Sequence, residues 1–158
     1  FPFGAVMLSD KIVEVFESDT SGKGSIGSGY TYSGHPVGAA AAIACLKETE
    51  RLSVKDNAAA RGAQLFEGLN ALKEKFELIG DVRGGHGLMC ALELVSDRDS
   101  KTAIDKKTIG RIHRATYEAG AMVRVSGPNI ILSPPLILTA AHVDTILSAL
   151  DAGFASVA

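Results

Sequence analysis

The sequence of 158 residues has no tryptophan, only two cysteines and almost no excess charge of either sign. Sixteen lysines and arginines stand against eighteen aspartates and glutamates, which gives a net charge of −2. Binding to a nucleic-acid backbone needs a surplus of positive charge, so nucleic acid is a poor candidate partner. Because no apolar run approaches the roughly 18 residues of a bilayer span, no membrane segment is expected either.

The surroundings of the two cysteines in the sequence indicate whether their thiols are buried and whether the protein meets a reducing environment. Cys45 and Cys90 stand among small and aliphatic neighbours, in AAIACL and LMCALEL, a pattern typical of buried thiols that pack as small hydrophobes. The sequence alone leaves a disulfide between them open. No secretory pattern is visible, so a reducing cytoplasmic location is expected. The four histidines have no metal-ligand spacing, and no metal site is predicted.

Apolar residues make up 46% of the chain and charged residues 22%, as in a folded globular protein. Residues 10–16 fit a short helix or a strand equally well. Ser53 and Asp56 form a capping-box-like pair in front of an amphipathic segment, and Thr139 can cap a last helix. We expect helices over residues 36–52, 54–75, 105–119 and from 139 onward.

Strand patterns alternate with these helices. LMCALELV places four apolar side chains on one face of a strand and turns Glu93 outward. FGAVML, AMVRV and NIIL also read as strands, and VRGGHG as a turn. The sequence therefore predicts a mixed α/β fold.

The stretch 18–34 is rich in glycine and hydroxyl residues and predicts a long loop. Gly22, Gly24 and Gly27 spell GxGxxG, but a dinucleotide site needs a helix directly after the last glycine, and here the helix begins only near Pro36. The block GYTYSGHP that ends the loop offers hydroxyls and backbone donors for a phosphate. A plain polar turn is an equal alternative, with His35 helping to cap the helix.

The block GYTYSGHPVGAAAA resembles the signature of the class III pyridoxal-phosphate aminotransferases. These fold type I enzymes include the omega-amino acid:pyruvate and amine:pyruvate transaminases. The resemblance continues, in family order, through FPFGAVMLSDKI, DVRGGHGLMCALELV and AMVRVSGPNIILSPPLILT, and so covers essentially the whole chain.

This resemblance implies a domain organisation. Residues 1–45 match the end of the large domain that binds pyridoxal phosphate (PLP) and the start of the interdomain helix, and residues 46–158 match the small C-terminal α/β domain. The family's catalytic lysine lies upstream of Phe1. We therefore expect the chain to be about the last third of an aminotransferase, inactive alone, whose parent is a homodimer.

The resemblance also assigns site residues. Thr31 matches the threonine whose hydroxyl binds the cofactor phosphate of the neighbouring subunit, and Tyr30 matches a position whose backbone amide contacts that phosphate. Arg124 matches an arginine that binds the substrate carboxylate. A guanidinium suits a carboxylate, and Arg124 stands among apolar residues in AMVRVSGP. The alternative is an arginine at a strand end that extends into solvent.

The expected activity of the parent is ping-pong transfer of an amino group from an amine or omega-amino acid to a keto acid such as pyruvate. An aminomutase or decarboxylase of the same superfamily would use similar contacts and stays open. From a different class, a non-catalytic α/β interaction module also stays open, because the cofactor-binding lysine is absent from these residues.

Overall fold

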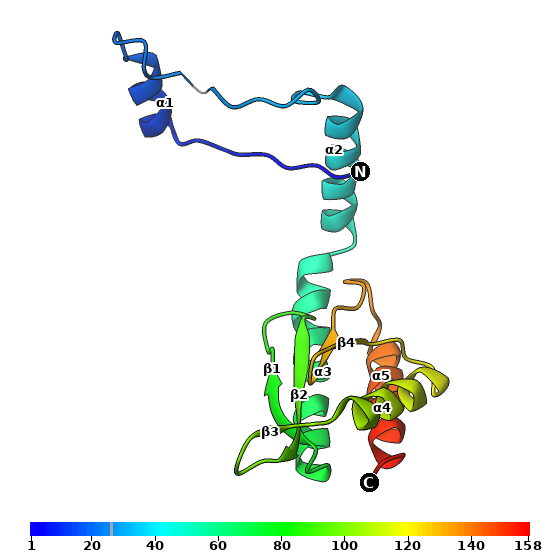
Figure 1. The fold of residues 1–158 in the computed structure, drawn as a ribbon. Helices are drawn as coiled ribbons and strands as arrows, with labels where there is room; N and C mark the ends of the chain where they lie inside the picture. The colour runs from blue at the N-terminus through cyan, green and yellow to red at the C-terminus, as the bar shows by residue number, and fades with distance from the viewer. Residues whose placement is uncertain (26) are drawn as a thin grey trace. The chain divides into compact units, whose positions relative to one another are not determined.

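The computed structural model describes residues 1–25 and 27–158, which form two compact units, residues 1–49 and 50–158. The first unit holds α1 (Asp10–Glu17), the long loop that follows it and most of α2 (Pro36–Arg51), as labelled in Figure 1. The expected loop is confirmed over residues 18–25 and 27–34, with residue 26 outside the described residues, and the helix that starts at Pro36 is confirmed as well. The segment that fits helix or strand equally well is a helix, α1.

The first unit buries almost nothing within this chain. Gly38 is its one buried residue among those described, and large apolar side chains of α1 and α2 are exposed. The prediction of a strand in FGAVML is wrong, because residues 3–8 pair with no other described segment. Burial of Cys45 was also predicted wrongly, since no part of the unit covers its side of α2.

The second unit contains three further helices: α3 (Val54–Lys75), α4 (Lys106–Glu118) and α5 (Ala140–Ala155). Thr139 caps α5 as expected, in a capping box with His142. The capping box predicted at Ser53 is wrong. Ser53 has a left-handed backbone with φ of 47°, which accommodates the two-residue turn between α2 and α3, and its hydroxyl makes no cap bond.

The strands of the second unit form one antiparallel sheet with the order β1-β2-β5-β4, and β3 pairs with the other end of β2. Gly127, with φ of 57°, lies in the tight turn between β4 and β5. The turn predicted over VRGGHG is partly wrong, because β1 continues to Arg83 before the glycines begin. The bounds are β1 Ile79–Arg83, β2 Cys90–Asp97, β3 Thr102–Ala103, β4 Arg124–Ser126 and β5 Asn129–Leu132.

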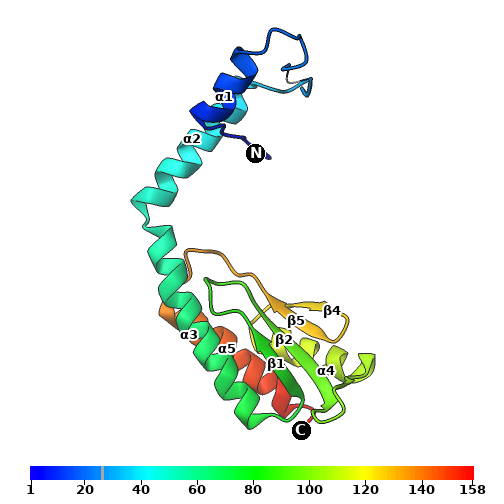
Figure 2. The same ribbon diagram turned by 90° about the vertical axis from the view of Figure 1, so that its left-hand side faces the viewer.

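One face of the sheet forms the core with the helices, and Figure 2 shows α3 and α5 side by side against it. Leu88, Cys90, Leu92 and Leu94 are all buried on this face, as the alternation predicted. Both cysteines are free thiols in this structure, and burial raises the pKa of Cys90.

The opposite face of the sheet is not covered within the second unit. The strand register places one set of residues on it, and none of them is buried. The set is Asp81, Arg83, Ala91, Glu93, Arg124, Ser126, Asn129 and Ile131. We call this surface the open sheet face. In the described ranges, no helix has the length and apolar character needed to cross a membrane.

Candidate functional site

The GYTYSGHP block folds into a tight turn directly in front of α2. The amide of Ser33 donates to the carbonyl of Tyr30 at 2.9 Å, and the amide of His35 donates to that of Tyr32 at 3.1 Å. Gly34 closes the turn with φ of 73°, a conformation that favours glycine. The block is therefore a defined turn and not a loose connection.

Backbone amides in this turn and at the start of α2 already have hydrogen-bond partners within the chain. The amide of Tyr30 donates to the hydroxyl oxygen of Ser33 at 3.0 Å. The amides of Val37 and Gly38, in the first turn of α2, point to Nδ1 of His35 at 3.1 and 3.4 Å. His35 thus caps α2, as the sequence suggested, and the helix N-terminus is not left open to an anion.

Thr31 offers a free hydroxyl in this block. Its side chain is exposed, and its hydroxyl makes no hydrogen bond to any residue that the structure describes. A phosphate fits this donor set through the Thr31 hydroxyl. The Tyr30 amide can join only if the Ser33 hydroxyl turns away from it.

A cavity of about 700 Å³ in the second unit is lined by the α4–β4 connection, by the segment that follows β5 and by side chains of α4 and α5. Arg124, the first residue of β4, lies at this cavity together with His113 and Tyr117 of α4. Most of the other lining is apolar, from residues such as Met122 and Leu138.

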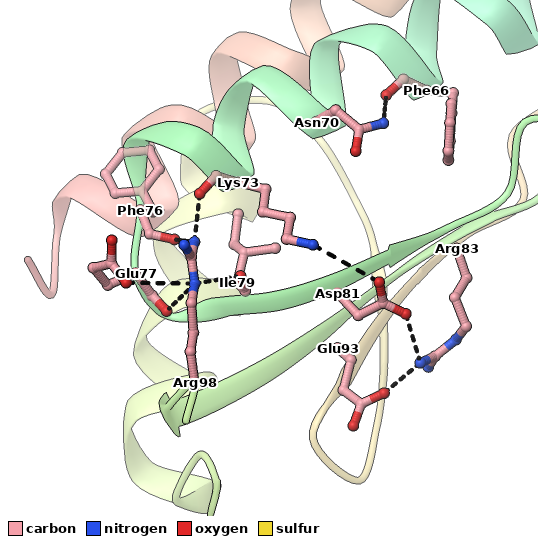
Figure 3. A network of polar contacts seen from close by, with 10 residues as sticks. All are labelled: Phe66, Asn70, Lys73, Phe76, Glu77, Ile79, Asp81, Arg83, Glu93 and Arg98. Carbon is pink, nitrogen blue, oxygen red and sulfur yellow. Dashed lines mark hydrogen bonds and ion pairs between the residues drawn. The ribbon is translucent and has the colours of Figure 1, made fainter. Parts of the chain in front are cut away.

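Arg124 and Arg83 lie on the open sheet face but differ in their contacts. Figure 3 shows Arg83 between Asp81 and Glu93, and its guanidinium also donates to Asn129 Oδ1 at 2.8 Å. Its hydrogen bond to Glu93 raises the pKa of Arg83. The guanidinium of Arg124 has no hydrogen bond or ion pair with any of the residues described, so its planar fork is available for a carboxylate.

The three residues that the sequence singled out thus belong to two different units. Tyr30 and Thr31 are neighbours in the turn of the first unit, whereas Arg124 belongs to the sheet of the second. His113, on the same cavity as Arg124, was not singled out as a site residue. No local motif marks it, because its relation to Arg124 depends on how α4 packs beside β4.

Comparisons with known proteins identify the family of the chain. The family model for class-III aminotransferases matches residues 1–153, and the chain belongs to this family. An uncharacterized aminotransferase of Sinorhizobium fredii is 38% identical, over 99% of this chain and 34% of its own length. A probable mitochondrial gamma-aminobutyrate transaminase of rice, Oryza sativa subsp. indica, is 34% identical, over 93% of this chain and 29% of its length.

Solved structures show the same relationship. The PLP-bound crystal structure of an amine transaminase from an uncultivated Pseudomonas species matches with a TM-score of 0.84 and 43% identity, over 92% of this chain and 33% of the other. The mixed α/β fold expected from the sequence is thereby confirmed. The chain spans about a third of the length of these relatives.

Proposed function

We propose that these residues belong to a PLP-dependent aminotransferase that moves an amino group from an amine or omega-amino acid to a keto acid such as pyruvate. The family membership supports the reaction class. An acceptor with a carboxylate is supported by one observation: the guanidinium of Arg124 has no partner among the described residues and lies beside an apolar cavity. The activity is that of the full-length protein, because the chain spans only about a third of its relatives.

For the cofactor, we propose that Thr31 donates its hydroxyl hydrogen to the phosphate group and that the Tyr30 amide assists it. In a homodimer, this phosphate would belong to the cofactor of the neighbouring subunit. When bound, PLP supplies the electron sink for the carbon that carries the amino group. The exposure of Thr31 and its lack of hydrogen-bond partners within the described chain support this role.

For the substrate, we propose that Arg124 holds the keto-acid carboxylate through two parallel N–H···O bonds. A simple amine has no carboxylate and gains nothing from this contact. Arg124 therefore fixes the orientation of the acceptor, and of a donor only if that donor is an amino acid. The rice relative, named a gamma-aminobutyrate transaminase, makes gamma-aminobutyrate a suitable donor to test.

The remaining parts of the proposal concern the division into domains and the location in the cell. Residues 1–45 would complete the large PLP-binding domain and begin the interdomain helix, and residues 46–158 would form the small domain. The free thiol of Cys90 is consistent with the reducing cytoplasm that we propose as the location, although the rice relative is named mitochondrial.

The test is alanine formation by the full-length protein with added PLP, pyruvate and an amine labelled with ¹⁵N at its amino group. We expect the ¹⁵N in alanine, with one carbonyl product of the donor, an aldehyde or a ketone, formed per alanine. Donor consumption with loss of carbon dioxide would indicate a decarboxylase, and an isomerised donor without alanine would indicate an aminomutase. No reaction with any donor, in a sample shown to bind PLP, would contradict the proposal.

A further inference from the structure

The connection from α4 to Arg124 is held by one side chain of α4. Nε2 of His113 lies 3.1 Å from the carbonyl oxygen of Val123, the residue directly before Arg124. A carbonyl oxygen only accepts hydrogen bonds, so Nε2 carries the hydrogen and donates it. The contact is partly buried, and Val123 itself is buried.

This contact occurs beside a short edge strand whose backbone, among the residues described, is paired on one side only. β4 contains only three residues and pairs on one side, with β5. Gly120, with φ of 105°, leads from α4 into the connection, and the amide of Ala121 donates to the carbonyl of Thr116 at 3.1 Å. Within the described ranges, the His113 ring makes the only side-chain hydrogen bond to residues 120–125.

We propose that His113 is a positioning residue that holds the backbone of Val123, and thereby the guanidinium of Arg124, in place for the carboxylate of the acceptor. This inference rests on the role proposed above for Arg124. His113 acts through the carbonyl of Val123 and does not touch the substrate. Without this bond, the strand keeps its ladder with β5 and the core packing of Val123 and Val125, but no side-chain hydrogen bond from the described residues holds the backbone just before Arg124.

A second histidine outside the cavity provides a matched control. His86 lies in the loop between β1 and β2, is exposed and does not line the cavity beside Arg124. Its ring makes no hydrogen bond to the residues described. The His86→Leu variant therefore makes the same change of side chain without touching the cavity or the connection to β4.

The first test uses steady-state kinetics of the full-length enzyme. The His113→Leu variant fills most of the space of the ring but cannot donate, and we expect the KM for pyruvate to rise about 3- to 10-fold, as for the loss of one hydrogen bond. The KM for a simple amine stays within about twofold of the native value, and in the His86→Leu control both KM values stay within that range. The His113→Gln variant, whose amide can reach the same carbonyl, restores the pyruvate KM, whereas the shorter His113→Asn does not.

A double-mutant cycle separates this role from general damage to the fold. If His113 acts through Arg124, then His113→Leu adds nothing to the pyruvate KM once Arg124→Ala is present. An equal rise in KM in both backgrounds would overturn the proposal. An unchanged pyruvate KM in His113→Leu would overturn it as well.

Hydrogen exchange supplies a readout that does not depend on turnover. We expect the amides of residues 120–126 to exchange several-fold faster in His113→Leu and in His113→Asn than in His113→Gln or the native protein. Equal exchange in all four proteins would overturn the proposal. If Arg124→Ala leaves the pyruvate KM unchanged, the role proposed for Arg124 fails, and the exchange rates still decide whether His113 holds the strand.

Discussion

Nη2 of Arg98 lies 3.0 Å from the carbonyl oxygen of Phe76, the residue at which α3 ends. The same guanidinium also reaches the carbonyls of Lys73, Glu77 and Ile79, as Figure 3 shows. The last carbonyls of a helix have no hydrogen-bond donors within the helix. Here the guanidinium of Arg98 donates to the carbonyls at and just after the end of α3. Arg98 therefore fixes the end of α3 and its turn into β1.

Replacing Arg98 with alanine should lower the free energy of unfolding by about 1–3 kcal/mol, because partly buried carbonyls lose their donors. Arg114→Ala is the matched control. It removes an exposed arginine whose one ion pair, with Glu118 on the same helix, contributes less than about 1 kcal/mol. Urea denaturation of the full-length protein measures both variants. Equal effects of the two changes would contradict the capping role of Arg98.

Gly62 of α3 packs against the backbone of the loop between β1 and β2. A Cβ at this position would lie 2.2 Å from the carbonyl oxygen of Gly87, and a backbone atom cannot easily give way. Gly62→Ala should therefore destabilise the protein by about 1–3 kcal/mol. Gly110 of α4 has open space around it, so Gly110→Ala should stabilise by about 0.5–1 kcal/mol. Thermal melts that show the same sign for both would contradict this packing.

Asp105 caps α4 by accepting from the side chain and amide of Thr108 and the amide of Lys107. These bonds lower the pKa of Asp105 from its ordinary value of 3.8. A lowered folded-state pKa gives a stabilisation that is complete well above pH 4 and is lost as the pH falls through that lowered value. Asp105→Asn should therefore flatten the fall of stability between about pH 5 and pH 2. Urea midpoints at several pH values test this, and identical pH profiles would contradict it.

Thr31 offers a direct test of the cofactor contact. Thr31→Val keeps the shape of the side chain and removes the hydroxyl, so the Kd for PLP of the full-length apoprotein should rise about 10-fold or more. Thr20→Val makes the same change at an exposed site in the long loop and should leave the Kd unchanged. The cofactor's absorbance reports the titration. Equal affinities of the two variants would remove Thr31 from the phosphate site.

Local patterns predicted the parts of the fold that depend on local physics. The alternation over residues 88–94 reflects one buried sheet face, and Thr139 precedes α5 with its hydroxyl at the cap. β1 was missed because Gly80, Asp81 and the glycines after Arg83 hide its alternation. Cys45 was misjudged because its neighbours are those of a buried helix, but nothing in the described unit covers them.

The candidate site could be predicted from the sequence only in part, because some of its features depend on contacts between segments that are distant in the sequence. Thr31 and Arg124 were found through family motifs, which are local in sequence. That Arg124 lies free while Arg83 on the same face is engaged depends on strand register across β1, β2, β5 and β4. The contact of His113 with Val123 joins α4 to the connection in front of β4, ten residues along the chain, so no local pattern predicts it.

The central claim is that Arg124 holds the carboxylate of the amino acceptor in a transamination reaction. The most direct measurement compares the KM for pyruvate and for a simple amine in Arg124→Ala and in the native full-length enzyme, with Arg83→Ala as the control on the same sheet face. We predict a rise of about 10-fold or more for pyruvate in Arg124→Ala, little change for the amine, and no such split in Arg83→Ala. Equal changes for pyruvate and the amine in Arg124→Ala would contradict the account.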